Sequence, residues 1–108
     1  MRCKIKTRRL RDVPVLKIIG ELAGENSQRV SRKILSLGAL KTRSVAVDLS
    51  ETTFIDSHGL GVLVYAWKML ENGGKELVLL DPPPFIHTIL QGTNLATFIK
   101  VVESPELL

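Results

Sequence analysis

Residues 44–72 read SVAVDLSETTFIDSHGLGVLVYAWKMLEN, and this stretch decides the fold. Its first part, residues 45–49, is a short apolar run rich in valine, which is typical of a buried strand of a parallel sheet. We expect this strand to end at Ser50. A loop should follow it, in which Phe54 and Ile55 pack beneath the strand.

The second part of the stretch has the period of an α-helix. Its apolar residues recur at intervals of three and four, at Leu60, Leu63, Val64, Trp67 and Leu70. Two glycines, residues 73–74, predict the end of this helix. Asp56, Ser57 and His58 therefore lie at a helix N-terminus, where unpaired N–H groups and the positive end of the helix dipole face solvent. We expect Asp56 or Ser57 to cap the helix.

Length and composition predict a single domain over residues 1–108, because two domains would leave neither half enough chain to bury a core. No signal peptide is recognisable, and no apolar run approaches the roughly 20 residues that cross a bilayer. Cys3 is the only cysteine, so no internal disulfide can form. These features predict a cytoplasmic protein without membrane insertion.

The net charge of +4 originates in the first eleven residues. The basic side chains there are Arg2, Lys4, Lys6, Arg8, Arg9 and Arg11. Apolar and polar positions alternate over residues 3–8, which predicts an edge strand whose lysines and arginines prevent pairing with the edge of a neighbouring molecule. A patch for nucleic acid or anionic lipid is the alternative. This segment contains no aromatic side chain that could stack on bases, and we expect no nucleic-acid partner.

Turn residues and apolar periods predict the remaining elements. In the first half of the chain we expect a hairpin turn at residues 11–12, a strand over 13–19 closed by Gly20 and a polar connection over 21–26. A helix capped by Asn26 or Ser27 and ended by Gly38 should follow. In the second half we expect a strand over 75–80, a helix from Pro83 or Pro84 to Gly92, a strand over 98–102 and a terminal helix that starts at residues 104–106. The fold class is therefore α/β, with a mixed sheet of four to five strands, about four helices and the order β-β-α-β-α-β-α-β-α.

The polar residues of the chain do not form a recognisable catalytic or metal site. Consecutive residues at a helix start diverge, so Asp56, Ser57 and His58 do not predict a catalytic triad, and no G-x-S-x-G motif surrounds Ser57. His87 and Cys3 have no partner at the spacing of metal ligands, and no complete dinucleotide-binding motif is present. We predict a protein without enzymatic activity, catalytic residues, metal or cofactor.

A hydroxyl at the start of a helix is an accessible phosphorylation site. A phosphate at Ser57 would gain roughly 0.3–1 kcal/mol from the helix dipole. It would also add about 1.5 to 2 negative charges, enough to expel an apolar or acidic partner. Recognition and switching are therefore the functions that this loop favours.

The chain resembles the STAS domain of bacterial anti-sigma factor antagonists. The resemblance covers essentially the whole chain and rests on three runs: residues 47–63 with the D-S-x-G-L-G segment, residues 73–79, and Gly-Glu-Leu at residues 20–22. Leu90, Gly92, Leu95 and Phe98 add support near the end. The resemblance implies a mixed sheet with helices and no intrinsic catalysis.

It also implies a function and a mode of regulation. Members of this family bind an anti-sigma factor, often a serine kinase, and thereby release a sigma factor, and phosphorylation of the STAS domain reverses the binding. The usual phosphoserine position is His58 in this chain, and Ala23 replaces a common aspartate. Three interpretations follow: Ser57 has become the phosphoacceptor, the domain binds constitutively, or it serves a different partner.

The expected contact surface combines the Gly-x-Leu segment with the start of the central helix. Its residues are Glu21, Leu22, Ala23, Asp56, Ser57, His58, Gly59, Leu60, Gly61, Tyr65 and Lys68. The leading hypothesis is an anti-sigma factor antagonist whose partner is an anti-sigma factor with serine kinase activity. The alternative is a STAS scaffold subunit of a larger assembly with other STAS proteins, such as a stressosome-like or lipid-transport complex.

Overall fold

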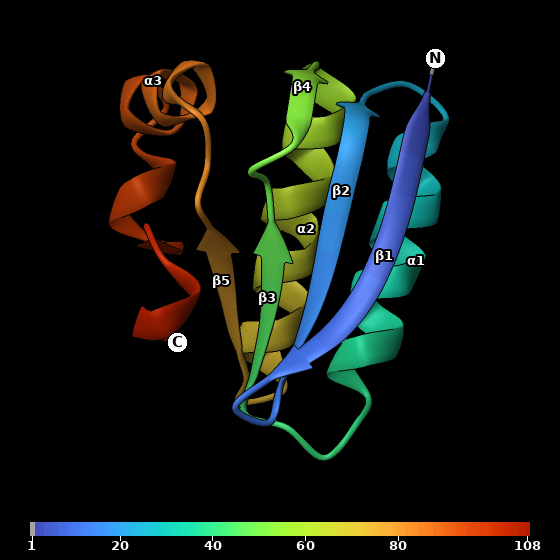
Figure 1. Cartoon of the computed structure of the whole chain (residues 1–108), viewed down its shortest axis with the longest axis vertical. Helices are drawn as coiled ribbons and strands as arrows, with labels where there is room; N and C mark the ends of the chain where they lie inside the picture. The colour runs from blue at the N-terminus through green and yellow to red at the C-terminus, as the bar shows by residue number, and fades with distance from the viewer. Residues whose placement is uncertain (1) are drawn as a thin grey trace.

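The computed structural model describes residues 2–108 and has an α/β architecture built on one mixed sheet of six strands (Figure 1). The elements are β1 (Cys3–Leu10), β2 (Val13–Leu22), α1 (Asn26–Gly38), β3 (Ser44–Asp48), β4 (Thr52–Ile55), α2 (Ser57–Asn72), β5 (Glu76–Leu80), α3 (Pro84–Gly92) and β6 (Lys100–Val102), with short 3-10 turns at Leu95–Thr97 and Pro105–Leu107. The strand order is β1-β2-β3-β5-β6, and β4 pairs with β2. This architecture confirms the predicted fold class.

The predicted number of elements differs slightly from the structure. The described residues form six strands and three α-helices, where we expected four to five strands and about four helices. The expected terminal helix is wrong, because residues 105–107 make a single 3-10 turn in which the Ser104 side chain accepts a hydrogen bond from the Glu106 N–H. The last strand begins at Lys100 rather than Phe98 because a 3-10 turn occupies residues 95–97.

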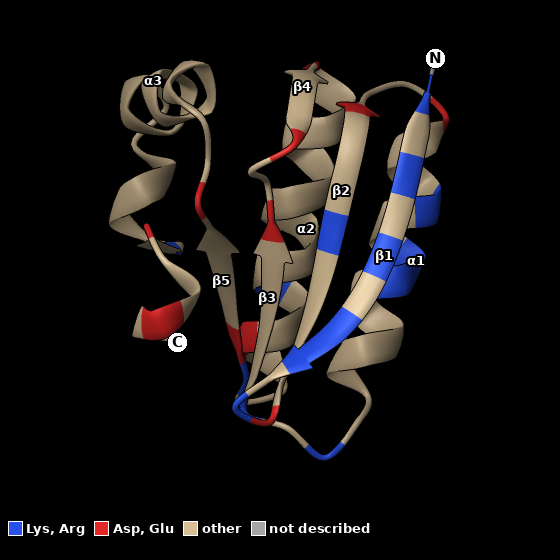
Figure 2. Ribbon diagram, in the orientation of Figure 1, with Lys and Arg blue, Asp and Glu red and all other residues tan. Residues whose placement is uncertain are grey.

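The N-terminal hairpin forms as predicted, and β1 lies at the edge of the sheet. Its turn residues, Arg11 and Asp12, both have positive φ angles of 51° and 66°. A two-residue turn of this kind matches the twist of the strands that it joins. Lys4, Lys6 and Arg8 are exposed, and Figure 2 shows basic residues along the length of β1.

The main core lies between the sheet and the two long helices. α1 and α2 both cover the same face of the sheet (Figure 1). Large side chains without exposed surface fill this layer, including Leu16, Ile18, Ile34, Leu63 and Leu79. Gly38 is in close contact with α2, since a Cβ there would lie 2.4 Å from Leu70 Cδ2. No helix within residues 2–108 combines the length and the hydropathy of a membrane span.

The sheet is extended where we had expected loops. β2 continues through Gly20 to Leu22, so the polar connection does not begin at Glu21. Gly20 has a φ of 103°, and a Cβ there would lie 2.4 Å from the Arg2 carbonyl oxygen. β4 pairs with this continuation of β2 in parallel. Ile55 is buried as expected, but Phe54 is 48% exposed, so the prediction that it packs beneath the strand is wrong.

The starts of the other helices agree only in part with the sequence. α1 begins at Asn26, and its N-cap residue Glu25 makes no side-chain capping bond, so neither Asn26 nor Ser27 is the N-cap. α3 begins at Pro84, which is one of the two prolines predicted to start it, and ends at Gly92 as predicted. Proline suits this position because the first N–H groups of a helix have no intrahelical acceptor.

Candidate functional site

Asp56 fixes the start of α2 to the end of β2. It occupies the N-cap position, and its Oδ1 accepts a 2.9 Å hydrogen bond from the Gly59 N–H. The other carboxylate oxygen, Oδ2, accepts a 3.0 Å hydrogen bond from the Gly24 N–H. The predicted capping role of Asp56 is thus confirmed. The second bond, which the sequence did not predict, joins segments that are 32 residues apart.

Gly59 allows the first turn of α2 to touch the backbone of β2. A Cβ at this residue would lie 2.1 Å from the Leu22 carbonyl oxygen, a distance that no side chain can tolerate. The same oxygen accepts a 3.4 Å hydrogen bond from the Asp56 N–H. The aspartate and glycine of the D-S-x-G segment therefore hold the loop in place.

The electrostatics of the loop favour an ionised Asp56. Its pKa lies below the ordinary value, chiefly because the Gly59 N–H bonds the carboxylate, with further contributions from the Gly24 N–H and from His58. His58 Nδ1 lies 3.6 Å from Asp56 Oδ2, and the histidine side chain is 74% exposed. The loop therefore presents an imidazole to solvent beside a carboxylate that is fixed by backbone hydrogen bonds.

Five of the predicted contact residues form one exposed stripe on α2. We call this stripe the α2 tip surface, and its residues are Ser57, His58, Gly61, Tyr65 and Lys68. At 3.6 residues per turn they fall within an arc of roughly 100°. Tyr65 is 52% exposed and supplies a large apolar ring with a polar hydroxyl. Such a ring on a regular helix is a suitable anchor for a protein partner.

The remaining predicted contact residues lie at the margin of this surface or beneath it. Glu21, Asp56 and Leu60 are half-buried. Leu22 and Ala23 have no exposed surface, so the prediction that they touch a partner is wrong. We had placed them in a polar loop, but Leu22 ends β2 and its side chain belongs to the core. Gly59 is also buried, against Leu22, and contributes by positioning the helix.

Two features near the loop were missed in the sequence. Gly24 donates to Asp56 and has a positive φ of 54°, a conformation that favours glycine. The sequence signal that could have indicated this role is the position of Gly24, two residues after the Gly-Glu-Leu run at residues 20–22. Phe54 adds an exposed aromatic ring on β4, just before the Asp56 loop.

The other titratable residues do not converge on a site. Within residues 2–108, no three His, Cys, Asp or Glu side chains are grouped in a way that could hold a metal ion. His87, to which we assigned no role, has its Nε2 3.1 Å from a carboxylate oxygen of Glu103. The side chain of Cys3 is half-buried beside the core.

Comparison with known proteins places the chain in a family. Residues 4–107 match the family model of the STAS domain. An anti-sigma F factor antagonist from Paenibacillus polymyxa is 24% identical over 105 residues, which is 96% of this chain and 90% of the relative. An anti-sigma-B factor antagonist from Listeria monocytogenes is 27% identical over 84 residues, which is 78% of this chain and 74% of the relative.

A solved structure from Thermotoga maritima, described as a candidate anti-sigma factor antagonist, has the same fold. It is 25% identical, covers 93% of this chain and 86% of its own, and gives a TM-score of 0.84. The family model and the shared fold agree with the resemblance that the D-S-x-G-L-G segment indicated. The chain belongs to the STAS domain family.

Proposed function

We propose that this protein is an anti-sigma factor antagonist, a binding module without enzymatic activity that sequesters an anti-sigma factor and so releases a sigma factor. Relatives that align with most of the chain carry this function in their names. The observation that carries the proposal is the α2 tip surface, where five of the residues expected to contact a partner form one exposed stripe.

The rigidity of this surface supports a role in docking. Asp56 bonds both Gly24 and Gly59, so the first turn of α2 is tied to the end of β2 before any partner arrives. A surface that is already ordered loses little conformational freedom on binding. Tyr65 provides the apolar anchor, and Ser57 and His58 provide polar groups at the tip.

The histidine at position 58 bears on regulation. Imidazole cannot become the phosphoserine that the family resemblance places at this position. Ser57 is the exposed hydroxyl beside it and the first residue of α2, and we propose it as the phosphorylation site. A phosphate there would add negative charge directly to the α2 tip surface, which would oppose the docking of an apolar or acidic partner.

Calorimetric titration against an anti-sigma factor of the same organism tests the docking surface. Tyr65→Ala and Ser57→Asp should each weaken binding, by at least about tenfold if these residues are anchors of the interface. Asn72→Asp is the matched control, because it adds the same charge at the far end of the same helix, about 22 Å away. Unchanged affinity in both tip variants would overturn the proposed surface.

Intact-mass analysis after incubation with that partner and ATP tests the switch. A gain of one phosphate that Ser57→Ala abolishes supports phosphorylation at Ser57. An unmodified mass with tight binding rejects Ser57 as the phosphorylation site and leaves a constitutive binder.

A further inference from the structure

The free edge of β1 offers unpaired backbone groups to a partner. The Glu21 N–H donates to the Arg2 carbonyl oxygen, and Cys3 lies opposite Gly20 in the register. Backbone groups alternate in direction along an antiparallel pair, so those of residues 4, 6, 8 and 10 point toward β2. Those of Ile5, Thr7 and Arg9 therefore point outward. β1 ends the sheet, so no other strand of residues 2–108 pairs with them.

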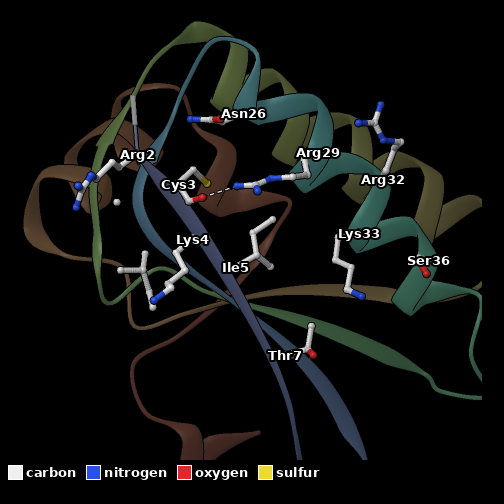
Figure 3. Close-up of a pocket in the computed structure, with 12 residues that line it drawn as sticks. Arg2, Cys3, Lys4, Ile5, Thr7, Asn26, Arg29, Arg32, Lys33 and Ser36 are labelled. Atoms are coloured by element: carbon white, nitrogen blue, oxygen red, sulfur yellow. Dashed lines mark hydrogen bonds between the residues drawn. The ribbon is translucent and has the colours of Figure 1, made fainter.

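A groove of about 1260 Å³ runs along the first half of this edge, between β1 and α1. Cys3, Ile5 and Ile19 are the apolar residues of its lining. Arg29 reaches across from α1 and donates to the Cys3 carbonyl oxygen, which closes one end of the open edge (Figure 3). The unpaired stretch therefore begins at Ile5.

The groove is strongly basic. Five of its lining residues are cationic, and they are Arg2, Lys4, Arg29, Arg32 and Lys33. No aspartate or glutamate lines it. In Figure 2, basic residues of both β1 and α1 are visible where these two elements lie next to each other. Figure 3 shows Arg2 and Lys4 on one side of β1, and Ile5 and Arg29 on the other. A segment lying on the edge would thus have cations on both sides.

We propose that the edge of β1 is a docking site for an acidic, extended segment of a partner protein, which adds to the sheet as a further strand. Outward N–H and C=O groups would bond the backbone of the segment, as in other cases of strand addition. Its alternate side chains would lie beside Lys4 and Lys6 on one face and near Arg32 and Lys33 on the other, whereas Arg8 is already paired with Asp48. This site is separate from the α2 tip surface and does not depend on the proposed function.

The charge of the edge selects among possible occupants. Lysine and arginine on an edge strand prevent pairing with a second copy, since like charges would face each other. The same charges attract a strand rich in glutamate or aspartate. A nucleic acid is less suited, because the lining contains no aromatic ring on which a base could stack.

Amide hydrogen exchange with a model peptide tests this proposal. The probe is a capped peptide of eight residues that alternates glutamate with valine, and its control alternates lysine with valine. In the free protein the amides of Ile5 and Thr7 should exchange faster than those of Lys4 and Lys6. Saturation with the acidic peptide should slow exchange at Ile5 and Thr7 by at least about tenfold, because the new ladder bonds protect them.

Two pairs of variants separate the backbone from the charge contribution. Thr7→Pro removes an outward N–H and leaves the ladder with β2 intact, so it should abolish most of the binding, whereas Thr7→Val should retain it. Lys4→Glu with Lys6→Glu, at exposed residues on the face that the glutamates of the peptide would share, should weaken binding about tenfold at low salt. Lys41→Glu with Lys100→Glu, at exposed residues outside the groove, should weaken it far less.

The proposal is overturned by any of three results. These are no binding of the acidic peptide at low salt, binding without slower exchange at Ile5 and Thr7, or tighter binding of single-stranded DNA or anionic lipid vesicles than of the peptide. Equal binding of the lysine peptide would overturn it as well, because charge complementarity defines the occupant.

Discussion

Replacing Gly59 by alanine should destabilise the protein, although alanine favours a helix. The new Cβ would lie 2.1 Å from the Leu22 carbonyl oxygen and 2.9 Å from Leu22 Cγ. The oxygen belongs to the backbone of a buried strand and cannot move aside, so we expect the upper end of the overpacking range, about 3 kcal/mol. The better helix propensity of alanine offsets about 1 kcal/mol of this loss of stability. The net loss is therefore about 2 kcal/mol, or roughly 8–16 °C in melting temperature.

Gly61→Ala is the matched control on the same helix. A Cβ at Gly61 would meet no atom within 4 Å, so only the propensity term remains, and the free energy of unfolding should rise by up to about 1 kcal/mol. Urea unfolding followed by circular dichroism at 222 nm measures both variants. If Gly59→Ala is as stable as the wild type, or if both variants shift in the same direction, the contact between α2 and β2 is not as tight as described.

Two further substitutions test the supports of the same loop. Asp56→Asn should lower the free energy of unfolding at neutral pH. The pKa of Asp56 is depressed in the folded state, so its charge stabilises the fold above the ordinary pKa of about 3.9 and loses this effect as the pH falls below it. The difference between variant and wild type should therefore shrink in acid, and a difference that stays constant down to pH 2 would contradict this role. Gly20→Ala should cost about 2 kcal/mol or more, because the residue has a φ of 103° and a Cβ would strike the Arg2 carbonyl oxygen; wild-type stability in urea unfolding would refute it.

Elements with a strong local pattern were predictable from the sequence. The valine-rich run gave β3, the intervals of three and four gave α2, and the turn at Arg11 and Asp12 gave the hairpin. Each of these signals lies within a few neighbouring residues. The capping role of Asp56 belongs to the same class, because its Gly59 partner is three residues away.

Elements that depend on distant partners were not predictable in this way. β4 has four residues, and only its pairing with β2 makes it a strand. A glycine such as Gly20 is typical of a strand end, yet β2 continues past it. Gly20 adopts a positive φ and, having no Cβ, lets the backbone of Arg2 pack against it. Phe54 is exposed because successive side chains of a strand point to opposite faces and the neighbouring Ile55 packs in the core.

The candidate site shows the same division. The exposed residues of the α2 tip surface follow from the helical period and the D-S-x-G segment. The burial of Leu22 and Ala23 and the bond from Gly24 to Asp56 depend on the approach of β2 to α2. The predicted contact residues therefore include two kinds that the sequence alone did not separate: residues that face solvent, and buried residues that position them.

Hydroxyl-radical footprinting of the complex with the anti-sigma factor tests the central claim most directly. His58 and Tyr65 are exposed and reactive in the free protein, and Phe98, which is 62% exposed and pairs with Trp67, serves as an internal reference. Docking on the α2 tip surface predicts strong protection of His58 and Tyr65 with Phe98 unchanged. Labelling of His58 and Tyr65 at the level of the free protein, in a complex shown to be saturated, would contradict it.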